Sequence, residues 1–215
     1  MSLSTATVPF GGVPITTTSI PISFTLSNVG TAPLAVTSIA INGANAADFA
    51  LSPASTCPLL PAILAVNTNC TTSMRFTPSA SGARSASVII TDNHQGSPTF
   101  ITTQAVSLTG TGTDFSLSAS PASITIPAGK MATYTITLTP VQGFNNPVAY
   151  TCAGGPTHSN CFISGVSNGS ATIILATSQG VNHGTFPVTF KATYTGVAPA
   201  TGTLAHSATA SLTIK

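Results

Sequence analysis

The stretch Ile20-Pro21-Ile22-Ser23-Phe24-Thr25-Leu26-Ser27 alternates apolar with polar or small residues, and Asn28-Val29-Gly30-Thr31 follows it as a turn. A period of two is expected of a β-strand with one buried face. The chain then begins a second apolar run from Leu34 to Ile41. Short strands separated by turn residues at this spacing predict a β-sandwich.

The same pattern continues outward from this stretch to both ends of the chain. No window keeps a helical period for long, and Thr and β-branched aliphatic residues, which favour strands, are abundant. The further predicted strands of the first half are Thr72 to Thr77, Ser85 to Thr91 and Phe100 to Thr109, with turns at residues 78–82 and 92–98. In the second half, alternation predicts strands around Phe115, Ile124, Tyr134, Tyr150, Ile173, Val188 and Leu212.

A Gly/Thr stretch, Thr109-Gly110-Thr111-Gly112-Thr113, lies between the two sets of strands. We interpret it as the end of the first domain, with a new cycle of strands opening at Asp114. The sequence therefore predicts an all-β protein of two tandem sandwich domains, residues 1–112 and 113–215.

Charged residues are almost missing from this chain. They make up 4% of 215 residues, with five Lys or Arg, three Asp and no Glu, against about a quarter in ordinary soluble domains. A net charge of +2 without a basic cluster gives no footprint for nucleic acid. The longest apolar run, Leu59 to Val66, is too short to span a bilayer and contains Pro61. Low charge promotes association, so the composition also fits a subunit that packs against copies of itself.

Several motifs of the first half resemble a known domain family. Residues 24–34 (Phe-Thr-Leu-Ser-Asn-Val-Gly-Thr-Ala-Pro-Leu), Asp48-Phe49, Arg75-Phe76-Thr77-Pro78 and the terminal residues 108–112 look like the abnormal-spindle/Hydin type of immunoglobulin-like domain. In bacteria this pattern occurs in "choice-of-anchor" modules. The second half is similar to an Ig-like repeat of bacterial secreted proteins, through residues 114–121, 137–140, 143–145 and His206-Ser207. Both resemblances imply immunoglobulin-like sandwiches that act as spacers, adhesive units or scaffolds and bring no catalytic residues.

The four cysteines fall two in each half, Cys57 and Cys70, then Cys152 and Cys161. Four cysteines allow three connectivities, and one pair per domain favours Cys57–Cys70 and Cys152–Cys161 as local loop staples. In the chain-entropy model, the first bridge would stabilise the folded state by about 3 kcal/mol, because it closes a loop in the unfolded chain. Zinc is the alternative, but neither pair has the close spacing of a zinc knuckle. Disulfides imply an oxidising location, which predicts an extracellular or cell-surface protein.

Candidate catalytic residues are few. Gly165-Val166-Ser167-Asn168-Gly169 fits the G-x-S-x-G pattern, but no acid follows it in the chain and Asn168-Gly169 is itself a hairpin signal. Asp48 and Asp114 are expected in turns or caps, and Asp92-Asn93 in a loop offers too few oxygens for Ca²⁺. The histidines, His94, His158, His183 and His206, show no ligand spacing. We expect no enzyme activity, no cofactor and no metal.

Other surface features leave alternatives open. The three tyrosines lie at apolar positions of predicted strands, which favours the core over a carbohydrate platform. Asn69-Cys70-Thr71 and Asn168-Gly169-Ser170 match the N-glycosylation acceptor, and glycans on Ser or Thr are an equal alternative.

Two functions follow from these observations. The first is a self-assembling subunit of a bacterial filament, sheath or surface layer, with other copies or surface proteins as partners. Its strand-exchange segment would be Ser4-Thr5-Ala6-Thr7-Val8-Pro9-Phe10. The alternative is an adhesion or spacer pair of Ig-like modules from a larger surface protein.

Overall fold

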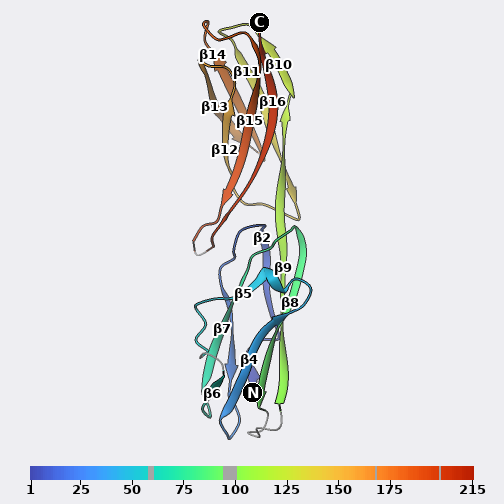
Figure 1. Cartoon of the computed structure of the whole chain (residues 1–215), viewed down its shortest axis with the longest axis vertical. Coiled ribbons are helices and arrows are strands. Elements are labelled where there is room, and N and C mark those ends of the chain that lie inside the picture. Colours follow the sequence, from blue (N-terminus) through green and yellow to red (C-terminus); the bar gives the residue numbers. More distant parts are fainter. Residues whose placement is uncertain (58–60, 94–100, 168, 199) are drawn as a thin grey trace. The chain divides into compact units, whose positions relative to one another are not determined.

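A computed structural model of the chain describes residues 1–57, 61–93, 101–167, 169–198 and 200–215. The chain divides into two compact units. Unit 1 comprises Met1–Thr113 with Gly196–Gly202, and unit 2 comprises Asp114–Thr195 with Thr203–Lys215. Both units are built from strands (Figure 1), as the alternation of the sequence predicts.

Unit 1 contains two sheets. One has the order β1-β3-β7-β5, and the other places β2, β9, β8, β4 and β6 side by side. A short 3-10 helix, Ala46–Asp48, precedes β5. The strands are β1 (Ser2–Leu3), β2 (Thr7–Pro14), β3 (Ile22–Ser27), β4 (Leu34–Asn42), β5 (Phe49–Leu51), β6 (Ala62–Leu64), β7 (Asn69–Phe76), β8 (Gly82–Asn93) and β9 (Ile101–Ser120).

Unit 2 also contains two sheets. One has the order β10-β16-β15-β12, and the other has the order β13-β14-β11 followed by the C-terminal part of β9. Its own strands are β10 (Ser123–Ile126), β11 (Met131–Val141), β12 (Ala149–Gly154), β13 (Ser159–Ser167), β14 (Ser170–Thr177), β15 (Gly184–Thr195) and β16 (Thr203–Ile214).

Each unit buries its core between its two sheets. In unit 1, the ring centroid of Phe76 on β7 lies 4.8 Å from that of Phe49 and 5.6 Å from that of Phe10 on β2. In unit 2, Tyr134 of β11 lies 5.1 Å from Phe190 of β15 on the opposite sheet. These rings are the inward-facing residues of alternating strands, so the sandwich predicted from the sequence is confirmed.

The first strand of each unit is divided between the two sheets. In unit 1, β1 pairs with β3 in one sheet, and β2 then pairs parallel to β9 in the other. In unit 2, the C-terminal part of β9 pairs with β11, and β10 then pairs parallel to β16. The two units therefore share one immunoglobulin-like strand plan despite their different sequences.

The Gly/Thr stretch at residues 109–113 forms part of a strand. β9 runs without a break from Ile101 to Ser120, pairing with β8 in unit 1 and with β11 in unit 2. Its glycines make room for neighbours, since a Cβ on Gly110 would lie 2.5 Å from the Phe76 ring, and one on Gly112 would lie 2.2 Å from the Ala80 carbonyl oxygen. Glycines at these positions, which look typical of a turn, are therefore required by the close packing of β9 against its neighbours.

Asp92 corrects a second expectation, which placed it in a loop. β8 extends to Asn93, and Asp92 is completely buried opposite Thr102 of β9. The Thr102 hydroxyl donates to Asp92 Oδ1 at 2.9 Å, and Gln104 Nε2 donates to Oδ2 at 3.5 Å. The carboxylate is therefore held within the strand pair. The remainder of the predicted turn, with His94, lies outside the described residues.

Candidate functional site

The disulfide of unit 1 fastens a connection to a strand. It joins Cys57, between β5 and β6, to Cys70 of β7. The adjacent backbone is also hydrogen-bonded to β7, because the N–H groups of Thr56 and Cys57 both donate to the Thr71 carbonyl oxygen. This bridge has the local character expected from the sequence.

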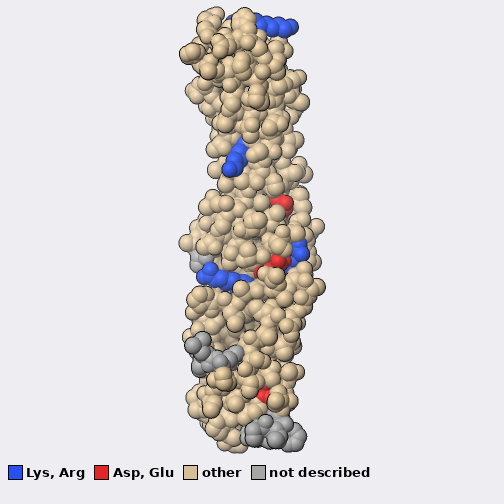
Figure 2. Space-filling model, viewed as in Figure 1, with Lys and Arg blue, Asp and Glu red and all other residues tan. Residues whose placement is uncertain are grey.

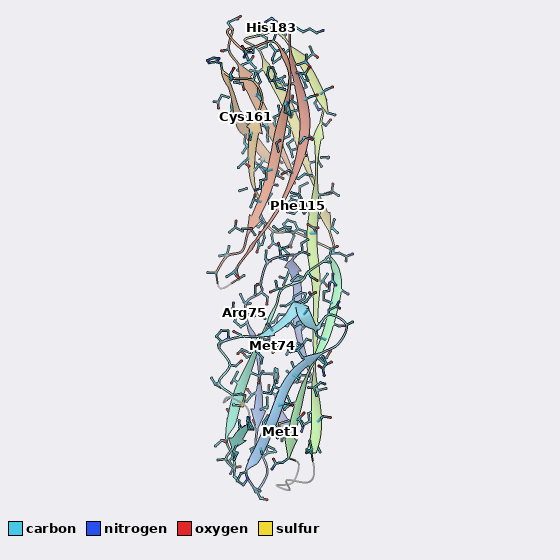
Figure 3. All side chains as sticks on the ribbon, in the orientation of Figure 1. Met1, Met74, Arg75, Phe115, Cys161 and His183 are labelled. Atoms are coloured by element: carbon cyan, nitrogen blue, oxygen red, sulfur yellow. A yellow bond between two sulfur atoms is a disulfide. The ribbon has the colours of Figure 1, made fainter. Side chains whose placement is uncertain are left out.

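The disulfide of unit 2 joins its two sheets. Cys152 lies on β12, an edge strand of one sheet, and Cys161 lies on β13, an edge strand of the other. Figure 3 shows Cys161 at the border of the unit. Because β12 and β13 are consecutive in the chain, two cysteines that are close in sequence can connect the two sheets. This corrects the expectation of a disulfide confined to one loop.

The same flank of unit 1 is closed by an extra strand. After β5 the chain crosses to the other sheet, where β6 pairs with β4 before β7 returns to the first sheet. Ala62 and Leu64 of β6 point inward and are buried, while Ile63 between them is exposed. Together with Cys57 and Cys70 they leave no space for a water molecule at this point. No strand was predicted for these three residues.

Unit 2 has no strand in the position of β6 among its described residues, and the flank between β12 and β13 opens into a groove. The groove has a volume of about 530 Å³. The disulfide ties β12 and β13 together at Cys152 and Cys161, and the groove lies farther along both strands, toward Tyr150 and Val166. Its lining residues are Leu138, Pro140, Phe144, Asn145, Asn146, Pro147, Val148, Tyr150, Val166 and Gly169.

Val166 of β13 lines this opening although, like Ile163, it belongs to the inner face of its sheet. Ile163 and Val166 stand opposite Ile173 and Ala171 of β14, both fully buried, and a bulge between Ile163 and Gly165 keeps them on that face. They are nevertheless 40% and 61% exposed. Inward-directed apolar residues with this exposure indicate core surface that the opposite sheet does not cover.

The groove carries no charged side chain. Its polar contacts are neutral, such as the Tyr150 hydroxyl donating to the Gly169 carbonyl oxygen at 3.3 Å. Burial raises the pKa of the Tyr150 phenol above its usual value, and burial does the same for Tyr134. The Tyr150 phenol therefore stays neutral at physiological pH, and the groove can offer apolar contact and backbone hydrogen bonds.

The proposed exchange segment, Ser4 to Phe10, is part of unit 1 in this chain. Thr7 to Pro9 pair with Ser107 to Thr109 of β9, and Val8 and Phe10 are buried. A register shift follows between Pro9 and Gly12. Exchange with a neighbouring copy would therefore require this strand to leave its own domain.

The candidate nucleophile lies on a hairpin. Ser167 ends β13 and stands opposite Ser170, the first residue of β14. A nucleophile elbow needs a helix after the serine, whereas a strand follows here. Asn168, which belongs to this motif and to one of the two glycosylation sequences, lies outside the described residues.

One contact between titratable groups was not anticipated. His206 Nε2 lies 2.7 Å from Asp114 Oδ1, and the same oxygen accepts the Phe115 backbone N–H at 2.7 Å. The His206 ring also packs edge-on against Phe115. Only turn or packing roles were predicted for Asp114 and His206, which are separated by 92 positions in the sequence.

The other acids and histidines lie apart. Asp48 is buried, accepts the Ser79 N–H and lies 3.5 Å from Arg84 Nε. His158 and His183 are exposed in connections between strands. In the part of the chain that the structure describes, no three His, Cys, Asp or Glu residues gather where they could hold a metal ion. No helix among these residues is long and apolar enough to cross a membrane.

Comparison with known proteins supports the domain type. Residues 1–106 match the family model described as HYDIN/CFA65/VesB-like, Ig-like domain. This match confirms the resemblance seen in the motifs of the first half. No curated protein matches the chain.

Solved structures give distant matches. The ASH/PapD-like domain 7 of human CEP192 is 18% identical, with a TM-score of 0.40, over 52% of this chain and 83% of that domain. The C-terminal domain of the AgI/II polypeptide BspA of Streptococcus agalactiae is 10% identical, with a TM-score of 0.38, over 97% and 95%. The secreted serine protease VesC of Vibrio cholerae is 10% identical, with a TM-score of 0.36, over 81% of this chain and 46% of VesC.

Proposed function

We propose that this chain, whose first 106 residues match a HYDIN/CFA65/VesB-like Ig-like domain, is a non-enzymatic extracellular structural protein whose copies assemble into a filament, sheath or surface layer. The observation that carries the proposal is the near absence of charge. Of the three acids, Asp48 and Asp92 are buried, and the side chain of Asp114 is 20% exposed. Figure 2 shows how few charged atoms one face of the molecule presents. Such a surface offers little repulsion to a second copy.

Uncharged strand edges support the same proposal. β12 and β13 are edge strands of unit 2 and contain no charged residue and no proline. Natural proteins usually protect such edges with charges or prolines, because free edges recruit other strands. Edges without that protection are able to pair with strands of other copies, as self-assembly requires.

An oxidising location is part of the proposal. Both pairs of cysteines form disulfides, which persist outside the cytosol. We place the protein outside the cell or on its surface. The abundant hydroxyl groups of Ser and Thr would be the points of glycan attachment.

Exchange of the segment Ser4 to Phe10 between copies is a further part of the proposal. Gly11, with φ of 69°, and the register shift at Pro9 to Gly12 supply a hinge after this segment. The strand could then occupy the same place beside β9 of a neighbour. A disulfide engineered between β2 and β9 would test it, since a non-reducing denaturing gel separates covalently linked dimers, formed by exchange, from internally cross-linked monomers.

Electron microscopy and sedimentation of the purified native protein test the proposed assembly. Fibres or sheets, or association that grows with concentration, are expected. A protein that stays monomeric up to millimolar concentration would contradict it.

The tandem arrangement of two Ig-like units favours one alternative, an adhesion or spacer pair within a larger surface protein. Additional domains encoded next to this chain, together with a monomeric protein, would support it. An enzyme would be indicated by a hydrolase activity that Ser167→Ala abolishes.

A further inference from the structure

We propose that the groove of unit 2 receives a strand from a second copy of this chain, which adds to the free edge of β12 and places its apolar side chains between β12 and β13. The inference rests on the proposed self-assembly and names the surface where it occurs.

Unit 1 provides the model for this contact. In unit 1 the sheet order ends β8-β4-β6, and in unit 2 the equivalent order ends β15-β12. β4 and β12 therefore hold the same place, but only β4 has a strand on its outer side among the described residues. That strand, β6, directs Ala62 and Leu64 inward and closes the flank. The groove beside β12 lies where such a strand is missing.

The groove defines the chemistry of the strand that fits it. An inserted strand must present apolar side chains at alternate positions, as β6 does. It must also carry no charge toward the groove, because no lining residue could pair with one. Main-chain hydrogen bonds to β12 would supply affinity and the alternate side chains would supply selectivity.

A second copy meets these requirements. This chain has five basic and three acidic residues in 215, and among its described strands only β7, β8, β9 and β15 contain any of them. No Lys, Arg or Asp lies on β12, β13 or β14 to repel an identical surface. An acidic or basic partner would find no complementary charge here, whereas another copy matches the neutrality of the groove.

Val166→Lys in the full chain is the decisive variant. Val166 is 61% exposed, so a lysine there can reach water in the free protein, but docking of a strand would bury its charge. Met131→Lys is the matched control, since Met131 is 65% exposed on β11 and does not line the groove. Sedimentation equilibrium from micromolar to millimolar concentration would measure self-association. Thermal unfolding would show that both variants are folded.

The expected result is that Val166→Lys weakens association by about 30-fold or more, as for a central interface residue, and that Met131→Lys leaves it unchanged. Equal association of Val166→Lys and the unmodified protein would overturn the groove as the docking surface and leave the proposed assembly standing. Equal weakening by both lysines would also overturn it, because added charge alone would then explain the effect. A chain that never associates would overturn both proposals.

Discussion

The two units of this protein share a strand plan and differ in how each closes the flank where its sheets meet. Unit 1 uses the extra strand β6, together with a disulfide from Cys57 in the connection between β5 and β6. Unit 2 uses a disulfide between the edge strands β12 and β13, and the flank beyond it stays open as the groove. The comparison teaches that a covalent bridge can hold two sheets together without covering their core, whereas a strand such as β6 covers the core with its inward-facing side chains.

The largest expected effects test whether the two cores are alike in strength. Phe76→Ala and Phe190→Ala each remove a fully buried ring, one in unit 1 and one in unit 2. Each is expected to lower the free energy of unfolding of its own unit by about 4 kcal/mol. Denaturant unfolding followed by hydrogen exchange, which reports each unit separately, would measure this. A Phe76→Ala protein with unchanged protection in unit 1 would contradict the packing described.

Removing each disulfide sharpens the comparison of the flanks. The double variants Cys57→Ser/Cys70→Ser and Cys152→Ser/Cys161→Ser are each expected to cost about 3 kcal/mol, since the closed loops are of similar length. The consequences should differ in place. Loss of the unit 2 bridge should speed hydrogen exchange along both β12 and β13, because no strand among the described residues covers that flank. In unit 1, β6 should keep its protection, and an equal loss there would show that the bridge alone closes the flank.

A glycine substitution distinguishes a packed strand from a flexible boundary. Gly112→Ala forces a Cβ against the Ala80 carbonyl oxygen and is expected to destabilise unit 1 by about 2 kcal/mol. Gly165→Ala, on the exposed strand β13 of unit 2, meets nothing within 4 Å and serves as the control. Thermal unfolding of the two variants gives the measurement. Equal midpoints would support a flexible linker at residues 109–113.

The smallest effect is a loss of stability at alkaline pH. Burial raises the pKa of Tyr134 and Tyr150 above the ordinary value of 10.0, so the folded protein holds these protons more tightly than the unfolded chain. The stabilisation is complete below pH 10 and is lost as pH rises through the folded pKa values. Both tyrosines belong to unit 2, so unit 2 should lose stability first. Tyr134→Phe/Tyr150→Phe should flatten the dependence, and a steeper slope would refute the assignment.

The strands that were predicted well are those whose two faces have different surroundings. Along Ile22 to Ser27 the buried Phe24 and Leu26 alternate with polar residues, and the predicted strand is observed there, although it begins two residues later than the predicted Ile20, which is exposed. β6 escaped prediction because three residues cannot show a period. Asp92 was misplaced because a carboxylate among turn-forming residues has the composition of a loop, and only the neighbours on β9 satisfy it.

The groove could not be predicted for a different reason. Val166 belongs to the G-x-S-x-G motif, where no strand was predicted, and its exposure on β13 depends on whether the opposite sheet extends beneath it. The contact of His206 with Asp114 likewise depends on two strands that the chain brings together after 92 residues. Alternation reports which face a side chain takes, but it carries no information on what lies across from that face.

By itself, the sequence determined that this protein is all-β and nearly uncharged, because alternation and composition are local properties that each strand displays on its own. The immunoglobulin-like type followed from the resemblance of its motifs to a known domain family. Only the tertiary structure decided that Gly110 and Gly112 belong to a packed strand, that the second disulfide spans two sheets and that one flank is closed while the other is open. These features depend on which strands become neighbours, and strand neighbours are chosen by the packing of the whole domain.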